Sequence, residues 1–323
     1  MGIESAASQV MVTGASGFIG RHLVRSLSQS GYQVVACVRD LSTPFNSSMS
    51  GLKLVQMKDL GEAEPWSEEV FHGVDVIVHA AARVHVLADP SSDPLACFRR
   101  DNTLATLRLA ERAAQHGVRR LIYISSIKVN GEQTAGEPYT ASDIPAPEDA
   151  YGISKAEAES ALFAVAENTG LEVVVIRPPL VYGPGVSANF WALRNWIKQG
   201  YPLPFGATDN RRSLVNVFNL VDLIQLCISH PKAANEVFLV SDGESISTAN
   251  LIRRIAKSLG RTIWLPRIPV PCLEFIAAVL GRGQIMRRLC SDLEVDIQKT
   301  SKMLGWEPSV SMEQALQCME KEL

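Results

Sequence analysis

Short apolar segments rich in β-branched residues alternate with helical patterns through the first half of this chain. The helical patterns are the amphipathic stretch "GFIGRHLVRSLSQSG" and two longer runs at about 97–116 and 150–169. The apolar segments are "QVMVTG", "YQVVACVRD", "LKLVQMKDL", "VDVIVHAAA", "RRLIYISS" and "LEVVVIRPP". Continuous apolar runs without period-two alternation indicate strands that crossover helices bury on both faces. The pattern therefore predicts an α/β fold with a doubly wound, right-handed parallel sheet.

The regular alternation ends after Arg177. The segments "PPLVYGPGVSANF" and "YPLPFGATDNRR" are rich in proline and glycine, and short helical patterns follow them. We expect a smaller C-terminal substrate lobe here. The sheet domain is expected to cover residues 1–178, with 214–236 returning to it, and the lobe to cover 179–213 and 237–323.

The composition is that of an ordinary globular protein. Of the 323 residues, 46% are apolar and 20% are charged, and the net charge of −3 favours neither a nucleic acid nor a membrane surface as partner. No apolar run reaches the length of a spanning helix, and the first residues lack the pattern of a signal peptide. Six cysteines and six histidines are scattered without metal-ligand spacing. We therefore expect a cytoplasmic protein with reduced thiols, no membrane insertion and no metal site.

A glycine-rich loop follows the first apolar segment and opens the first helical pattern. Gly14, Gly17 and Gly20 have a G-x-x-G-x-x-G spacing. Glycines at such a turn let a pyrophosphate approach the backbone N–H groups at the helix N-terminus. A glycine-rich turn between any strand and helix would give the same spacing, but the strand–loop–helix context favours a dinucleotide-binding domain of the Rossmann type.

The loop spacing resembles the extended branch of the short-chain dehydrogenase/reductase superfamily, in particular its NAD(P)-dependent nucleotide-sugar epimerases and dehydratases. Further matches are "MKDL", "HAAA", "ISS", Tyr151-x-x-x-Lys155 and "RPPLVYGPG", so the resemblance spans nearly the whole chain. The cofactor-binding residues that the resemblance implies are Gly14, Ser16, Gly17, Phe18, Ile19, Gly20, Arg39, Asp59, Leu60, Ala80, Ala81, Ala82, Asn102, Tyr151, Lys155 and Pro178.

Arg39 bears on the choice between NAD and NADP. An acidic residue about 20 positions after the glycine loop hydrogen-bonds the ribose hydroxyls of NAD, whereas an arginine accommodates the 2′-phosphate of NADP. Val38 stands where the NAD-using epimerases of the family carry an aspartate, and Arg39 follows it. A solvated arginine that only stacks on adenine is the other interpretation. The sequence favours NADP(H), with NAD(H) as the alternative.

The catalytic candidates are Tyr151, Lys155 and Ser126. Tyr151 and Lys155 are four residues apart, so a helix places them on one face. An adjacent ammonium and a positive nicotinamide would bring the phenol pKa toward neutrality, which suits acid–base work on a sugar hydroxyl. The resemblance assigns the catalytic hydroxyl to Ser126, and Ser125 is the neighbour with which it is most easily confused.

The resemblance also implies substrate contacts and one exclusion. The 4,6-dehydratases of the family carry Asp and Glu where this chain has Ile127 and Lys128, so we exclude a dehydratase. Asn189 and Arg212 match the family's diphosphate contacts, and Lys128 either contacts the substrate or is a solvated loop residue. Leu180 stands where sugar-binding epimerases often carry asparagine.

The function that this resemblance implies is an oxidoreductase acting at C4 of a UDP-sugar. The chain looks most similar to the 4-ketoreductases that reduce a UDP-4-keto-6-deoxy-N-acetylhexosamine to UDP-N-acetylquinovosamine for bacterial surface polysaccharide, including lipopolysaccharide O-antigen. A UDP-glucose or UDP-N-acetylglucosamine 4-epimerase is the first alternative, because it uses the same catalytic residues. A non-catalytic, dinucleotide-sensing member is the second. A homodimer is a family-level expectation.

Overall fold

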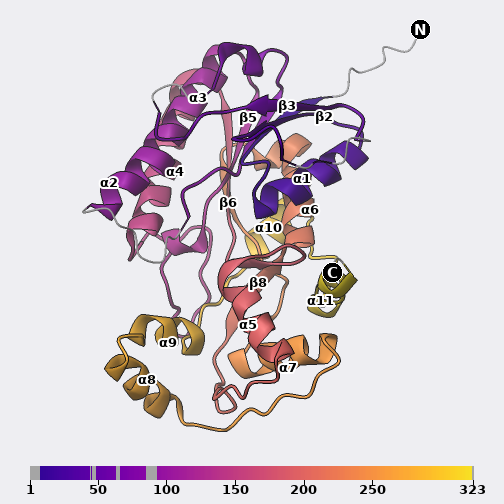
Figure 1. Ribbon diagram of the computed structural model, residues 1–323. Helices are drawn as coiled ribbons and strands as arrows, with labels where there is room; N and C mark the ends of the chain where they lie inside the picture. The colour runs from indigo at the N-terminus through magenta and orange to yellow at the C-terminus, as the bar shows by residue number, and fades with distance from the viewer. Residues whose placement is uncertain (1–7, 44, 46–48, 63–65, 85–92, 322–323) are drawn as a thin grey trace. The chain divides into compact units, whose positions relative to one another are not determined.

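The computed structural model describes residues 8–43, 45, 49–62, 66–84 and 93–321. One sheet has seven strands in the order β3-β2-β1-β4-β5-β6-β9 (Figure 1). The strands are β1 (Gln9–Thr13), β2 (Gln33–Val38), β3 (Leu52–Gln56), β4 (Val76–His79), β5 (Arg120–Ile124), β6 (Glu172–Arg177) and β9 (Glu236–Leu239). The pairings from β3 across to β6 are all parallel, and the strand order reverses between β1 and β4. The expected doubly wound parallel sheet is confirmed.

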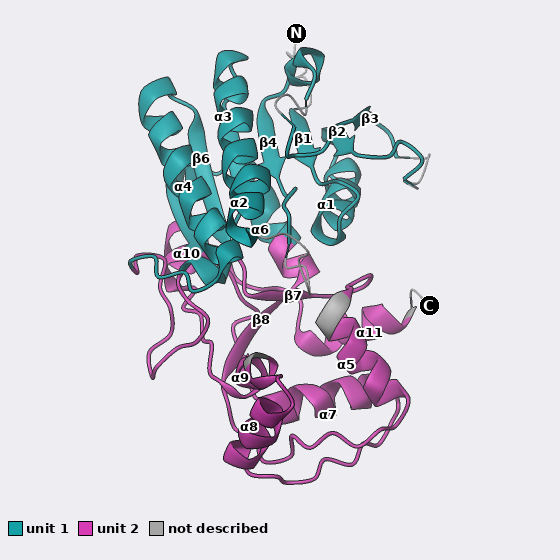
Figure 2. Ribbon diagram, turned by 60° about the vertical axis from the view of Figure 1, so that its left-hand side comes forward, with its two compact units in different colours: residues 1–129, 144–177, 221–238 teal, residues 130–143, 178–220, 239–323 magenta. Residues whose placement is uncertain are grey.

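Helices cover both faces of this sheet. On one face α3 (Ala105–Gln115) and α4 (Ala150–Thr169) bury Leu109 and Leu162 against strand residues such as Ile77 and Leu121. On the other side lies α1 (Phe18–Gln29), which packs against β1 and β2 (Figure 2). Successive strand residues point to opposite faces, so two helical layers require strands that are apolar throughout.

The two longer helical patterns differ in how regular they are. Helix α4 covers the expected range, begins at the N-cap Asp149, whose carboxylate accepts the Gly152 N–H, and ends at Gly170 with φ of +76°. The pattern at about 97–116 is divided into α2 (Pro94–Phe98), a π-helical turn η2 (Arg99–Leu104) and α3. Such π turns are frequent at functional sites.

The chain divides into two compact units (Figure 2). Unit 1 comprises residues 1–129, 144–177 and 221–238, and unit 2 comprises 130–143, 178–220 and 239–323. In this division 130–143 and 214–220 fall in unit 2, whereas the sequence placed them with the sheet domain.

Unit 2 has its own small sheet and core. The sheet order is β10-β8-β7, with β7 (Leu180–Tyr182) parallel and β10 (Ser245–Ile246) antiparallel to β8 (Arg212–Asn216). Its apolar core includes Tyr182, Ile252 and Leu316. The remaining helices of the chain are η1 (Glu68–Phe71), η3 (Ile127–Val129), α5 (Ala188–Lys198), α6 (Val217–Ser229), η4 (Pro231–Ala233), α7 (Thr248–Ser258), α8 (Val270–Val279), α9 (Gly283–Cys290), α10 (Gln298–Leu304) and α11 (Met312–Lys321). No helix among the described residues is both long and apolar enough to cross a membrane.

Candidate active site

The turn between β1 and α1 is packed so closely that it requires glycine. Gly14 has φ of +68°, and a Cβ on it would stand 2.7 Å from the backbone nitrogen of Ala81. A Cβ on Gly20 would stand 2.1 Å from the carbonyl oxygen of Gly14 and 2.8 Å from the Cα of Ala15. The Gly17 N–H donates to the same carbonyl at 2.9 Å. Side chains at these positions would force the turn open.

The first turn of α1 presents unpaired backbone donors at this turn. Gly17 is the N-cap and supplies no side-chain cap, so the N–H groups of Phe18, Ile19 and Gly20 have no acceptor within the helix. Gly17 is exposed, and Ser16 is partly exposed beside it. A helix N-terminus of this kind attracts an anion through both its donors and its dipole.

At the end of β2 the structure brings Arg39 and Asp59 together. The Arg39 guanidinium is 77% exposed, and its Nη1 lies 3.8 Å from Oδ1 of Asp59, which is equally exposed and precedes Leu60. Asp40 is engaged locally, because its carboxylate accepts the Ser42 N–H and hydroxyl at 2.8 and 2.7 Å. These hydrogen bonds lower the pKa of Asp40. The cation, loosely paired with Asp59, is therefore exposed enough to meet a ligand at this strand end.

The loop after β4 is anchored to β1. The N–H groups of Ala80 and Ala81 donate to the carbonyl and hydroxyl oxygens of Thr13, each at 3.3 Å. The same hydroxyl lies 2.6 Å from Nδ1 of His79. Burial, with a smaller contribution from Lys155, lowers the pKa of His79 to about 3, so its imidazole is neutral.

Asn102, on the π-helical turn, holds the next part of this loop. Its side-chain oxygen accepts the Arg83 N–H at 2.8 Å, and its amide donates to the Arg83 carbonyl at 3.1 Å. The amide also donates to Oγ of Ser154 on α4 at 3.0 Å. Asn102 is buried, so it fixes the loop that carries Ala82 against α4.

Ser126 and Tyr151 meet at the carboxyl end of β5. Tyr151 is the second residue of α4, and a side-chain interaction with Ser126 acts to lower the pKa of its phenol. The Ser126 hydroxyl also accepts the Lys128 N–H at 3.3 Å. Ser125 points elsewhere, into a buried contact with Glu159. The geometry therefore pairs Tyr151 with Ser126 and not with its neighbour.

Lys155 lies one turn farther along α4, with 2% of its side chain exposed. Its Nζ donates to the Ile124 carbonyl at 2.8 Å and lies 4.4 Å from the ring centroid of Tyr123 and 5.9 Å from that of Tyr151. Burial lowers the pKa of Lys155 to about 7, against an opposing effect of the Glu159 carboxylate.

The protein's own groups raise the phenol pKa. Burial and the negative charge of Asp149 raise the pKa of Tyr151 to about 12, and the interaction with Ser126 only partly offsets them. The lowering expected from the sequence depends on two positive charges, one at Lys155 and one on an oxidised nicotinamide. A lysine with a pKa of about 7 is only about half protonated at neutral pH, and it lies nearer to Tyr123 than to Tyr151.

A buried ion pair that includes Glu159, one turn after Lys155 on α4, was not predicted from the sequence. Arg177, at the end of β6, donates to the Glu159 carboxylate through Nε at 3.0 Å and Nη2 at 2.6 Å, and both side chains are buried. Ser125 donates to the same carboxylate at 2.5 Å. The four-residue spacing from Lys155 to Glu159 on one helix face was the signal available.

The substrate candidates have different surroundings. Lys128 forms an ion pair with Asp149, the N-cap of α4. Pro178, a cofactor-binding candidate, directly follows β6 and is buried. Asn189 lies on α5, but its side chain is outside the described residues.

Arg212, at the start of β8, lacks a carboxylate partner among the described residues. Its Nη1 donates to the Ser291 carbonyl at 3.0 Å. Burial lowers the pKa of Arg212, Asp292 opposes this effect, and the neighbouring Arg288 adds to it. A partly desolvated guanidinium next to a second cation is suited to an anionic ligand.

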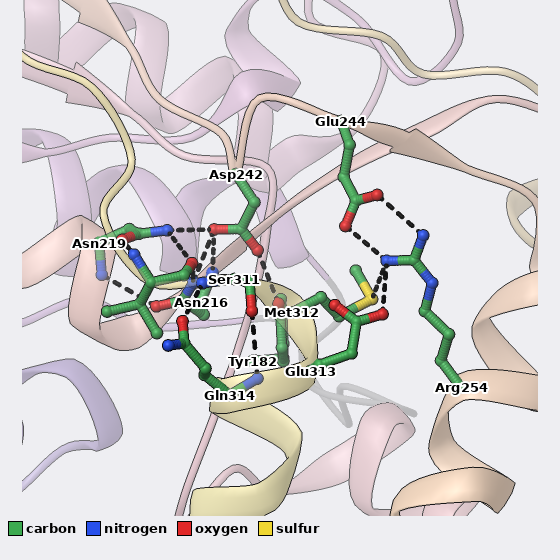
Figure 3. Close-up of polar contacts among 11 residues, drawn as sticks. Tyr182, Asn216, Asn219, Asp242, Glu244, Arg254, Ser311, Met312, Glu313 and Gln314 are labelled. Carbon is green, nitrogen blue, oxygen red and sulfur yellow. Dashed lines mark hydrogen bonds and ion pairs between the residues drawn. The ribbon is translucent and has the colours of Figure 1, made fainter.

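A second polar cluster, in unit 2, is internally satisfied (Figure 3). The Asp242 carboxylate accepts the Tyr182 hydroxyl at 2.6 Å, the Asn216 backbone and side-chain N–H groups at 2.9 Å each, and the Asn219 amide at 2.8 Å. Both asparagine amides also donate to the Val310 carbonyl at 2.9 Å. Burial raises the pKa values of Tyr182 and Asp242. The cluster ties β7 and β8 to the segment before α11, which gives the tyrosine of "RPPLVYGPG" a structural role.

The residues of unit 1 fit a dinucleotide. A Cβ would fill the turn at Gly14 and Gly20, the start of α1 offers free donors, and a half-protonated lysine lies beside a phenol and a hydroxyl. The described part of the chain contains no group of three or more His, Cys, Asp or Glu side chains placed to hold a metal ion.

Comparisons with known proteins identify the family of this chain. A sequence model described as the NAD dependent epimerase/dehydratase family matches residues 10–241. The chain is 44% identical over 316 residues to a UDP-glucose 4-epimerase of Vibrio cholerae, with 97% of this chain and 94% of that protein covered. The fold is similar to that of a UDP-glucose 4-epimerase of Thermotoga maritima with UDP-glucose, with a TM-score of 0.76, 24% identity and 97% of each chain covered. A UDP-glucuronic acid 4-epimerase of Bacillus cereus in complex with NAD has a TM-score of 0.77 and 21% identity, with 97% of this chain and 99% of that one covered. This chain is an enzyme that belongs to the NAD dependent epimerase/dehydratase family.

Proposed function

We propose that this enzyme is a 4-epimerase of a UDP-hexose, with UDP-glucose or UDP-N-acetylglucosamine as its substrate. The observation that carries the proposal is the placement of Tyr151 on α4, where Ser126 acts on its phenol, one helical turn from the buried Lys155. The 44% identity to the Vibrio cholerae protein supports an epimerase over the 4-ketoreductase that the sequence placed first.

The dinucleotide would be held by the glycine turn, the start of α1, the strand end at Arg39 and Asp59, and the loop from Ala80 to Ala82. When bound, it would supply the hydride acceptor and donor for C4 of the sugar. Asn102 would keep that loop in place without touching the ligand itself, because its amide is occupied by Arg83 and Ser154.

Tyr151 would move the proton of the C4 hydroxyl. With a pKa of about 12 the phenol is protonated at neutral pH, so it needs a nearby positive charge to act as a base. Lys155, with a pKa of about 7, can take up a proton as the phenolate forms and release it as the phenol is restored. Ser126 would donate a hydrogen bond to the C4 oxygen while it carries negative charge.

The same residues argue against elimination. A 4,6-dehydration needs an acid and a base at C5 and C6, and Ile127 offers neither. Lys128 is occupied by Asp149. Of the three expected substrate contacts, Arg212 has the surroundings that best suit the diphosphate of a nucleotide sugar, and Asn189 is proposed from its match to the family alone.

The test is to purify the enzyme, release its bound dinucleotide by denaturation, and incubate a parallel sample with UDP-glucose or UDP-N-acetylglucosamine alone. An epimerase retains its dinucleotide and converts the sugar to a mixture of C4 epimers without net redox change, which proton NMR of the anomeric and C4 signals reports. The proposal fails if neither sugar changes at C4 while the dinucleotide is bound.

Arg39 favours a second candidate, the UDP-4-keto-6-deoxy-sugar 4-reductase. An exposed guanidinium at the end of β2 suits the 2′-phosphate of NADPH, the reductant of such an enzyme. This enzyme would oxidise added NADPH stoichiometrically with a UDP-4-keto-6-deoxy sugar. Arg39→Asp should then weaken the binding of NADPH far more than that of NADH. Equal loss of affinity for both dinucleotides would remove the argument for NADP. Lys53→Asp, at another exposed cation on β3, is the matched control.

A further inference from the structure

Helix α8 carries a row of exposed apolar side chains in unit 2. Phe275 and Val279 are 71% and 72% exposed, and Ile276 and Leu280 are also exposed. At about 100° per residue, Phe275, Ile276 and Val279 fall within a single arc of the helix. Leu273 and Ala277 are buried on the adjoining side, so α8 is apolar on its outer face as well as its inner one.

Exposed apolar side chains also occur on the segments that flank α8 in sequence. Helix α8 packs against α9, and the turn between them is closed by the Arg282 N–H donating to the Ala277 carbonyl at 2.7 Å. Ile285 is exposed on α9, and Trp264 is exposed on the segment leading into α8. Figures 1 and 2 show α8 and α9 as a helical hairpin. We call the exposed side chains Trp264, Phe275, Ile276, Val279, Leu280 and Ile285 the α8–α9 apolar surface.

Exposed arginines occur in the same stretch of the chain as this surface. Arg261, Arg267, Arg282 and Arg287 are exposed, and no carboxylate among the described residues forms an ion pair with any of them. From 261 to 291 the only acidic residue is Glu274, which lies on α8 about 150° from the centre of the outer apolar arc. Apolar side chains bordered by unpaired arginines are complementary to a surface that is apolar below and anionic above.

We propose that the α8–α9 apolar surface docks on the anionic face of a lipid bilayer. Helix α8 has ten residues, about 15 Å, so it is too short to cross a hydrocarbon core of about 30 Å and would lie in the interface. Phe275, Val279 and Leu280 would enter the boundary of the acyl chains while the arginines meet lipid phosphates. A row of exposed apolar side chains along a helix marks an interaction site.

A second copy of the chain fits this surface less well than a bilayer. In a two-fold interface the same patch lies on both sides, so Arg282 and Arg287 would face an equally positive patch. The only acid available to neutralise them there is Glu274, on the far side of α8. The enzyme is therefore expected to bind the membrane surface without first forming a dimer through the α8–α9 apolar surface.

The test is co-sedimentation of the full chain with vesicles of phosphatidylcholine alone or mixed with phosphatidylglycerol. We expect binding to the mixed vesicles that weakens as ionic strength rises, because salt screens the arginines. Phe275→Asp/Val279→Asp should reduce binding at least about tenfold. Arg267→Gln/Arg282→Gln should reduce it about fivefold for each arginine removed.

Two matched controls lie away from this surface. Ile144→Asp places a charge at an apolar side chain that is 88% exposed in unit 1, and Arg253→Gln removes an exposed arginine from α7. Both should bind vesicles as the wild type does, and the circular dichroism spectra of all variants should match. Equal binding by the wild type and the Asp pair would overturn the proposal. So would an absence of binding to mixed vesicles, or a dimer in light scattering that Phe275→Asp/Val279→Asp dissolves.

Discussion

Replacing Lys155 with methionine should change how the stability of the protein depends on pH. In the folded protein the pKa of Lys155 is about 7, against an ordinary value of 10.5, because the side chain is buried. At about 1.4 kcal/mol per pKa unit, the charged lysine costs the fold up to about 5 kcal/mol. Below pH 7 the folded and unfolded states both bind the proton, so this free-energy cost applies in full. The cost disappears as the pH rises toward 10.5.

The size of the change follows from the two pKa values. Between about pH 7 and 10.5 the unfolded chain keeps the proton that the folded chain has lost, so the free energy of unfolding rises with pH. From pH 6 to pH 9 the wild type should gain about 3 kcal/mol relative to Lys155→Met. The buried Lys155 on α4 therefore lowers the stability of the fold, and it can exchange its proton near neutral pH.

The assay is urea unfolding followed by circular dichroism at pH 6, 7, 8 and 9 for the wild type, Lys155→Met and Lys53→Met. Lys53 is exposed on β3, so Lys53→Met is the control for removing a lysine outside the buried site. A difference between wild type and Lys155→Met that stays constant from pH 6 to pH 9 would refute the reasoning, because Lys155 would then titrate alike in both states.

Two further changes test the surroundings of the site. Gly20→Ala puts a Cβ 2.1 Å from the Gly14 carbonyl oxygen, so dinucleotide affinity measured by calorimetry should fall at least about tenfold, whereas Gly283→Ala, whose added Cβ would stand 3.8 Å from the Ala278 Cα, should leave it unchanged. Arg177→Met leaves the Glu159 carboxylate buried and unpaired, which should lower the free energy of unfolding by about 3–5 kcal/mol. The double variant Arg177→Met/Glu159→Leu should recover much of this loss, and no recovery would mean that the buried charge is not its source.

The sheet could be predicted because its strands are buried on both faces. Segments such as "LEVVVIRPP" carry no polar face, and only a parallel sheet between two helical layers explains several such runs along one chain. Helix α4 has the bounds expected at about 150–169, and Asp149 and Gly170 are standard caps for it. The π-helical turn was not predicted, because it depends on the contacts of Asn102 with Arg83 and Ser154 and not on local propensity.

The pKa values and ion pairs of the candidate site were harder to predict from the sequence than its candidate residues were. Residue spacing places Tyr151 and Lys155 on one helix face, but the pKa of each depends on burial, which the spacing does not encode. The spacing of Lys155 and Glu159 points to Glu159 but not to Arg177, which lies 18 residues away in sequence at a strand end. The sequence places Lys128 close to Ser126 but does not reveal its ion pair with Asp149.

The central claim is that the Tyr151 phenol, beside Ser126 and Lys155, moves the C4 proton of a UDP-sugar. Its most direct test is the turnover of Tyr151→Phe on UDP-glucose and UDP-N-acetylglucosamine, read by NMR at C4, together with the dinucleotide content of the purified variant. We predict that turnover falls by about 10²–10⁴-fold while the bound dinucleotide is unchanged. Turnover within about threefold of the wild type, with the dinucleotide in place, would contradict the account.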